Sequence, residues 1–413
     1  MIKIPRHISI APVAFRVTGL ASKFVFFMVC AAYLTVSDIA LFALVSSLVY
    51  FAVFLFGLEY HTHTSREISD GDNKTLKTAI FRHGFLALGT LAPLILVLAF
   101  VPGFWASRPI FISIMICALI VTEQLSAEAT RILNAKRRYL HASIALFLRA
   151  GAWTIFTTIS FFLFSNTRNI EFVLITWLFG NIAATIFASS KLASIIKAEP
   201  NSRKALPPFY LGLRAASPFL IGAISFRGLN ILDRFLLSSF WEDAALAAYA
   251  IFYSMSVSIL VLADAMLIVP AQANAVFAAR KGEFEKLKTI VIRLSWQVLI
   301  LTSLLGVLII IVGRIFVITL GKPEYIDNFI LLPIIVMAQV FFTLSIPPHV
   351  YLYSLAMDKK ILLSNLSALP VFLLVEWATF GLGPVSIAIS LACAFFSIMA
   401  LKIMYSVREW SIK

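Results

Sequence analysis

The chain has 413 residues, of which 61% are hydrophobic and only 13% are charged. A soluble protein would carry about twice that charged fraction. Together with a mean hydropathy of +0.96, these values exclude an ordinary soluble enzyme and indicate an all-α polytopic membrane protein. The formal net charge of +14 fits basic loops gathered on one membrane face, so we expect no nucleic-acid partner.

Apolar runs recur along the whole chain, and each is near the roughly 20 residues that a bilayer core requires. The first run is expected to remain as an uncleaved helix, although a basic tip precedes it as in a signal peptide. A tight turn at Ser37–Asp38 separates the first two runs, and Pro270 and the pair Pro347–Pro348 are expected to kink or break the eighth and the tenth. The runs predict about 12 spans, at 11–36, 39–58, 83–101, 110–130, 140–164, 172–190, 210–239, 246–278, 289–319, 328–355, 361–380 and 385–405.

Basic residues lie mostly in alternate loops, as at Lys136–Arg138 and Arg280–Lys281, and Lys402 and Arg408 are assigned to the same side. The opposite side has few. By the positive-inside bias, both termini are predicted to be cytoplasmic.

The stretch "GLEYHTHTSREISDGDNK" at 57–74 is therefore predicted to be the cytoplasmic end of the second helix and the loop after it. His61 and His63 are two residues apart and do not share a helix face, so no metal site is expected there. Cys30, Cys117 and Cys393 all lie in apolar runs, and they indicate neither a metal motif nor a disulfide framework.

An internal repeat is suggested by the span count and by one short match. The second span begins "DIALFAL" and the eighth begins "AALAAYAI", each after a short outward turn. Six spans in each half predict two six-helix lobes, 1–200 and 201–413, related by an axis along the membrane normal. Parallel repeats of this sort enclose a central cavity between the lobes in several transporters.

Ionisable residues inside membrane spans are costly and by default face a bundle interior or a water-filled cavity. Here their sign is mostly positive, and Lys23, Arg149 and Arg227 lie deepest in their spans. Guanidinium groups bind phosphate with two parallel hydrogen bonds, so a surplus of cations favours an anionic substrate. The substrate-binding candidates are Lys23, Arg149, Arg227, Arg16, Arg234 and Asn230, the last two forming one stripe with Arg227.

Acids inside the spans are the candidates for coupling to an ion gradient, because no nucleotide-binding motif is present. Asp264 is the first candidate, since it is the only acid in the eighth span and lies six residues before Pro270. The alternative is that it only pairs with an arginine in the membrane. The other coupling candidates are Asp233, Glu123 and Glu376.

Three segments carry a family likeness: "FRVTGLASKFVFFMVCAAYLTVSDIALFAL", "FGLEYHTHTSREIS" and "FRGLNILDRFLLSSFWEDAALAAYAI". Together with the span count and loop pattern, they resemble the polysaccharide (O-antigen type) flippases of the MATE-like MOP exporter superfamily. The likeness extends over nearly the whole chain.

The resemblance implies a transporter, not an enzyme, that needs no cofactor and lies in the cell inner membrane. It would move a polyprenyl-pyrophosphate-linked oligosaccharide of lipopolysaccharide, capsule or exopolysaccharide from the cytoplasmic to the outer leaflet. Protons or sodium ions, membrane lipid, and polysaccharide polymerase and chain-length proteins are the implied partners. Ser65, Arg66 and Glu67 match the family's helix end, which implies a gating or structural role.

Two alternatives remain open. Another MATE-like exporter, of drugs, organic cations or lipids, would be expected to have carboxylates rather than cations in its cavity. A polysaccharide polymerase or ligase embedded in the membrane would be expected to have a sizeable outward loop, and the predicted outward loops, such as 165–171 and 240–245, are short.

Overall fold

The computed structural model describes residues 10–58, 60, 76–86, 89, 110–198 and 209–410, and none of these residues forms a β-strand. The chain is divided into two compact units. The N-terminal unit comprises residues 1–38 and 45–220, and the C-terminal unit comprises 39–44 and 221–413. The lobes 1–200 and 201–413 and the cavity between them remain a prediction.

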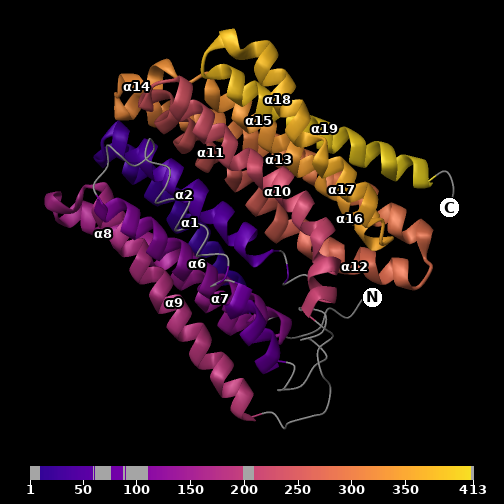
Figure 1. Ribbon diagram of the computed structural model, residues 1–413. Coiled ribbons are helices and arrows are strands. Elements are labelled where there is room, and N and C mark those ends of the chain that lie inside the picture. The colour runs from indigo at the N-terminus through magenta and orange to yellow at the C-terminus, as the bar shows by residue number, and fades with distance from the viewer. Residues whose placement is uncertain are drawn as a thin grey trace. The chain divides into compact units, whose positions relative to one another are not determined.

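The N-terminal unit is a bundle of long helices (Figure 1). Its elements are α1 (Ile10–Tyr33), α2 (Val36–Gly57), α6 (Ile110–Ala135), α7 (Tyr139–Phe147), the π-helical η1 (Leu148–Ala152), α8 (Trp153–Leu163), the 3-10 turn η2 (Ser165–Thr167) and α9 (Ile170–Ala198). Residues 39–44 of α2 belong to the C-terminal unit.

The break between the first two helices lies at Leu34–Thr35, three residues before the predicted turn at Ser37–Asp38. The reason is local. Thr35 has an extended backbone and its hydroxyl accepts a hydrogen bond from the Asp38 amide, which makes Thr35 the N-cap of α2. Asp38 then lies in the first turn of α2, where a carboxylate is favourable.

The C-terminal unit contains most of α10 (Phe209–Phe240), whose first residues belong to the N-terminal unit. Its other elements are α11 (Asp243–Ala263), the π-helical η3 (Asp264–Ile268), α12 (Val269–Arg280), α13 (Phe284–Leu320), α14 (Pro323–Asp327), α15 (Leu331–Leu344), α16 (Ile346–Ser354), α17 (Asp358–Leu366), α18 (Ala368–Thr379), the 3-10 turn η4 (Phe380–Leu382) and α19 (Val385–Trp410). The tenth predicted span is interrupted at Ser345, just before Pro347–Pro348, and a π segment precedes Pro270 in the eighth.

Ten stretches of the described residues are long and apolar enough to cross a membrane. Two of them run through π segments, at 139–163 and 243–280. The predicted span 83–101 lies mostly outside the described residues. The span at 210–239 is the helix α10, which carries Arg214, Arg227, Asp233 and Arg234 and is not one of the ten. The protein is therefore a multi-pass helical membrane protein.

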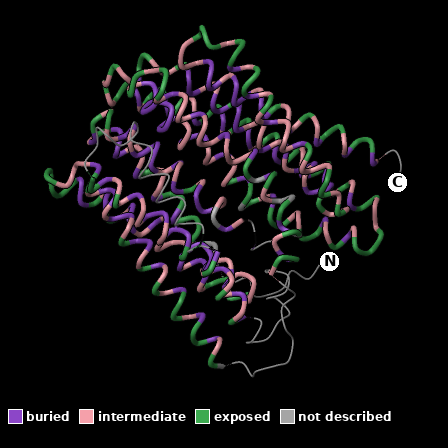
Figure 2. The backbone as a smooth tube through the Cα atoms, in the orientation of Figure 1, coloured by how far each residue is buried: buried purple, intermediate pink, exposed green. Residues whose placement is uncertain are grey.

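Each unit has its own core. In the N-terminal unit, α6 packs along α9, and α1 packs against α7, η1 and α8. In the C-terminal unit, α19 packs against α15 and α18, and α11 packs against α13 and α15. Buried and exposed residues alternate along the helices, as Figure 2 shows. Many of the exposed residues are large and apolar. Exposed leucine, isoleucine and phenylalanine are expected where a helix faces lipid.

Gly19 and Gly151 allow a close approach of two helices in the N-terminal unit. A Cβ on Gly151 would lie 2.7 Å from the Gly19 Cα. Beside this contact, Ser22 donates to the Gly151 carbonyl over 3.3 Å, and Thr154 donates to the Ser22 hydroxyl over 3.0 Å. Small residues of this kind let backbones pack closely in membranes, where polar side chains bond across helices.

Gly151→Ala should therefore destabilise the protein. Alanine normally favours a helix over glycine by about 1 kcal/mol, but here its methyl group forces α1 away, at a cost of about 1–3 kcal/mol. We expect a lower melting temperature in detergent by fluorescence-detected size-exclusion chromatography. The control is Gly84→Ala in the same unit, where an added Cβ meets no atom within 4 Å. Equal melting of Gly151→Ala and the parent would refute the close-packing role.

Candidate functional site

Lys23 is a candidate cation of the N-terminal unit whose partner is a hydroxyl group and not an acid. It lies half-buried on α1. Its ammonium donates a hydrogen bond to the Tyr50 hydroxyl over 2.7 Å and lies 4.9 Å from the centre of the Tyr50 ring. The Tyr50 side chain is 38% exposed. Among the described residues, no carboxylate pairs with Lys23, so its charge is not neutralised within this part of the chain.

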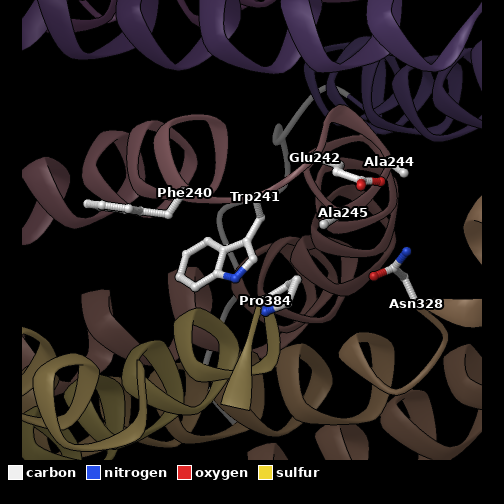
Figure 3. A pocket seen from close by; sticks show the side chains of 7 residues that line it. All are labelled: Phe240, Trp241, Glu242, Ala244, Ala245, Asn328 and Pro384. Atoms are coloured by element: carbon white, nitrogen blue, oxygen red, sulfur yellow. The ribbon is translucent and has the colours of Figure 1, made fainter. Parts of the chain in front are cut away.

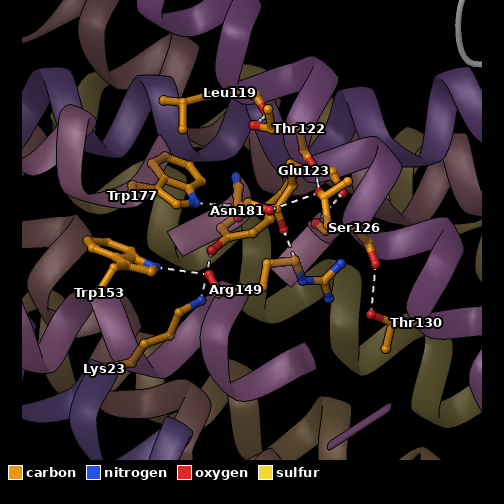
Figure 4. Close-up of polar contacts among 12 residues, drawn as sticks. Lys23, Leu119, Thr122, Glu123, Ser126, Thr130, Arg149, Trp153, Trp177 and Asn181 are labelled. Atoms are coloured by element: carbon orange, nitrogen blue, oxygen red, sulfur yellow. Dashed lines mark hydrogen bonds and ion pairs between the residues drawn. The ribbon is translucent and has the colours of Figure 1, made fainter. Parts of the chain in front are cut away.

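Arg149 has a different setting, because it forms a buried ion pair with Glu123. Arg149 Nε lies 3.4 Å from Glu123 Oε1, and the carboxylate is only 4% exposed. The other oxygen, Oε2, accepts a hydrogen bond from Trp177 Nε1 over 3.3 Å. Figure 4 shows these groups converging from η1, α6 and α9. The sequence places both charges in the membrane, but the structure shows that they compensate each other.

The π-helical segment η1 sets the position of Arg149. In a π turn, the backbone bonds shift from four to five residues apart, which occurs frequently at functional sites. The Trp153 indole N–H donates to the Arg149 carbonyl over 2.9 Å. The Trp153 ring stacks on Trp177 with centroids 5.7 Å apart and an interplanar angle of 17°. The two indoles therefore fix both partners of the ion pair.

Asn181 lies one turn after Trp177 on α9 and is fully buried. Neither polar atom of its side-chain amide has a hydrogen-bond partner among the described residues. Buried polar groups are normally satisfied by protein or ordered water. An amide of this kind beside the ion pair indicates that the cluster can accept a further polar group (Figure 4).

Arg16, two turns before Lys23 on α1, is exposed, and its Nε donates to the Ser143 hydroxyl over 3.2 Å. It is therefore held by α7 and not by an acid among the described residues. Arg16 and Lys23 lie on the same face of α1, as their spacing predicts.

The stripe on α10 forms a polar network within the C-terminal unit. Tyr249 donates to Asp233 Oδ2 over 2.7 Å, and Tyr253 donates to the Asn230 side-chain oxygen over 2.8 Å. Arg234 lies 3.5 Å from the Asp233 carboxylate and 4.7 Å above the Tyr253 ring. Asp233 thus pairs with its own neighbour, and both side chains are largely buried. Arg227, two turns earlier, is half-buried.

The remaining coupling candidates, Asp264 and Glu376, have contrasting environments. Asp264 begins the π segment η3 and is exposed. Glu376 on α18 is buried, and its two oxygens accept hydrogen bonds from the Ser386 and Ser390 hydroxyls over 2.8 and 2.9 Å. No basic side chain pairs with Glu376 in the described part of the C-terminal unit.

A second buried polar cluster escapes the sequence analysis. Glu128 pairs with His83 Nδ1 at 2.9 Å and with Arg131 on its own helix, and Gln124 donates to it over 3.3 Å. The sequence places Glu128 near the predicted end of its span, and His83 lies 45 residues before it. Neither fact predicts that the two side chains form a pair. The available signal is the spacing of Gln124, Glu128 and Arg131 on one face of α6.

The structure adds the burial of Lys402, which the sequence assigns to the basic cytoplasmic side. Lys402 is only 4% exposed on α19, which continues past it to Trp410. It lies one turn before Ser406, whose hydroxyl donates to the Pro348 carbonyl of α16. Its assignment to the cytoplasmic side remains a prediction. Ser65, Arg66, Glu67, His61 and His63 lie outside the described residues.

No family model and no curated protein matches the sequence. Solved structures do match the fold. An inward-facing multidrug resistance MATE family transporter of the MOP superfamily superposes with a TM-score of 0.76 at 11% identity, covering 97% of this chain and 98% of that one. The lipid II flippase MurJ in an inward closed conformation superposes with a TM-score of 0.73 at 15% identity, covering 97% and 87%. The chain has the MATE-like fold.

A second MATE structure, in complex with MaL6, superposes with a TM-score of 0.66 at 12% identity over 97% of this chain and 96% of that one. Identities this low establish the shared fold and leave the substrate to the residues of this chain. The expected MATE-like architecture is confirmed, and the O-antigen flippase subfamily is not distinguished by these likenesses.

The ion pair in the N-terminal unit should show strong energetic coupling. Glu123→Gln leaves the Arg149 guanidinium without its anion, and we expect a stability loss of about 3 kcal/mol. Combined with Arg149→Gln, the loss should be smaller than the sum of the two single losses, because neither charge is then left unpaired. Thermal unfolding in detergent measures all three, with Glu171→Gln, an exposed acid of the same unit, as the control. Additive losses would exclude the coupling.

Proposed function

We propose that this protein is a flippase that moves a polyprenyl-pyrophosphate-linked oligosaccharide from the cytoplasmic to the outer leaflet of the inner membrane. The observation that carries the proposal is Lys23: a half-buried ammonium on a membrane helix, bound to a hydroxyl, with no carboxylate partner among the described residues. Such a group suits an anionic headgroup, because a cation in the membrane is stable only if something neutralises it.

Arg16 and Arg227 are further candidates of this cationic set within their own units. Glu123 and Asp233 pair with Arg149 and Arg234. In the proposed mechanism, Lys23 binds a phosphate of the substrate, and Arg149 holds the helices of the N-terminal unit in the binding geometry. The likeness in fold to a lipid II flippase supports a lipid-linked substrate.

Export of a drug or an organic cation is the second candidate, supported by the likeness in fold to a multidrug transporter. The sign of the charge on Lys23 opposes it, because a positive group repels a cationic substrate. Drug resistance of cells that express the protein, lost on deletion, would favour this candidate.

Removal of the Lys23 charge should abolish surface glycan. We expect Lys23→Gln to reduce glycan display at least about tenfold if one charge-assisted bond to phosphate is lost, while the protein remains in the membrane. Tyr50→Phe removes only the hydroxyl and should have a smaller effect. The matched control is Arg293→Ala, an exposed cation of α13. Normal display by both Lys23→Gln and Arg227→Ala would overturn the flippase proposal.

Coupling to protons or sodium ions is proposed to use Asp264 or Glu376. Burial and purely hydroxyl partners support Glu376, and the adjacent π segment supports Asp264. We expect Glu376→Gln to remove the response of transport in vesicles to an imposed pH or sodium gradient. A neutral amide has no negative charge with which to bind a proton or a sodium ion. Asp264→Asn is measured in parallel. A parental response in both variants would exclude both acids.

A further inference from the structure

A pocket of about 450 Å³ opens at one end of the C-terminal unit. Three connections meet there: the turn between α10 and α11, the residue after α14, and the residue before α19. Figure 3 shows the side chains of Phe240, Trp241, Glu242, Ala244, Ala245, Asn328 and Pro384 around it. Its volume lies within the range of small-molecule sites, which is roughly 300–1,000 Å³.

One wall of the pocket is aromatic and held in place. Trp241 and Phe240 each lie 5.3 Å from the Phe380 ring of η4, centroid to centroid. Gly383 turns the chain with a φ of 69°, a conformation that suits glycine. This turn brings Pro384 to the lining of the pocket. A Cβ added to Gly383 would lie 3.9 Å from the Trp241 indole nitrogen. These contacts therefore hold the Trp241 indole in one position at the pocket wall.

Some polar atoms that line the pocket remain available to hydrogen-bond a ligand. Asn328 donates its amide N–H to the Glu324 carbonyl over 2.8 Å, which orients the side chain and leaves its oxygen as an acceptor. Glu242 is exposed and brings a carboxylate to the rim. Within the described residues, neither the Glu242 carboxylate, the Asn328 oxygen nor the Trp241 N–H has a hydrogen-bond partner.

Aromatic side chains at a helix end are common at membrane interfaces, where their rings lie at the headgroup level. That reason explains Trp241 and Phe240 but not an open pocket that also presents a carboxylate and an oriented amide. A flat indole face, a carboxylate acceptor and an amide acceptor together match a sugar ring. The C–H face of a sugar packs on the aromatic ring, and its hydroxyl groups donate to the oxygens.

We infer that this pocket binds one saccharide unit of the transported glycan. The inference rests on the proposed flippase function. By the charge distribution, the turn at 240–245 is predicted to lie on the outer side, so the pocket would hold the sugar after it has crossed. The acids Glu242, Asp243, Glu324 and Asp327 outnumber two basic residues at this end of the unit, Lys322 and Arg314, the second of which lies 4.9 Å from the centre of the Phe329 ring. A neutral sugar tolerates that field, whereas a pyrophosphate is repelled from it.

An organic cation is the competing ligand, since carboxylates and aromatic rings attract cations. It is less favoured because the Glu242 carboxylate is exposed at the rim, where water and salt screen its charge. A sugar hydroxyl binds the same carboxylate through a short, directional hydrogen bond. Its binding therefore depends little on long-range electrostatic attraction. The two ligand classes therefore respond differently to salt.

The test is saturation-transfer difference NMR on the full chain in nanodiscs, with free glucose, galactose, N-acetylglucosamine, rhamnose and glucuronic acid as probes. We expect at least one saccharide to bind, and Trp241→Ala to weaken its binding about fivefold to tenfold through loss of the stacking face. Trp377→Ala is the matched control, because Trp377 is 83% exposed on α18 of the same unit. Glu242→Ala, at an exposed position, is the second variant and should also weaken binding.

Absence of saccharide binding, or binding that both Trp241→Ala and Glu242→Ala leave unchanged, would overturn the inference. Binding of tetraphenylphosphonium that falls with salt, with no saccharide bound, would assign the pocket to cations instead. The proposed function is tested separately by glycan display in Lys23→Gln. If Lys23→Gln loses glycan display but no saccharide binds, only the assignment of the pocket is overturned. If a saccharide binds but the cation variants Lys23→Gln and Arg227→Ala display glycan normally, only the flippase proposal is overturned.

Discussion

The ion pair between Glu123 and Arg149 is the interaction on which the described core of the N-terminal unit depends. Neither charge is tolerable alone on an apolar helix, since an unpaired buried charge costs several kcal/mol. Their pairing requires α6 and η1 to adopt one relative position. The stacked indoles of Trp153 and Trp177 donate hydrogen bonds to the backbone carbonyl of Arg149 and to the Glu123 carboxylate, so apolar packing and charge compensation fix the same geometry.

In each unit, one charged residue of the candidate functional site lies in a π-helical segment. Arg149 lies within the π segment η1, and Asp264 begins the π segment η3. Such segments disturb the regular backbone bonding of a helix and are frequent at functional sites. A straight helix would place each side chain on a different face. The irregularities are therefore part of how these charges reach their positions, and not incidental bends.

Charge compensation also separates the candidates by role. Arg149 and Arg234 are satisfied by acids within their own units, whereas Lys23 is bound by a hydroxyl. A cation already paired with an acid gains little from an incoming phosphate, because the existing bond must first be lost. The cation with a neutral partner gains most. The acidic end of the C-terminal unit complements this arrangement, since it disfavours retention of a phosphate where the sugar is proposed to bind.

The sequence by itself determines the membrane class, most of the helices and the sign of the charges within them, because hydropathy and charge are local properties of each run. It also indicates the interruptions near Pro270 and Pro347–Pro348, where proline cannot continue the backbone bonding. It does not determine the helix boundary at Thr35, where one hydroxyl decides the cap. Nor does it give the partner of Arg149, the burial of Lys402 or the pocket beside Trp241. Those depend on which helix faces meet, and residues 26 positions apart, such as Glu123 and Arg149, or 143 apart, such as Trp241 and Pro384, become neighbours only in the tertiary structure.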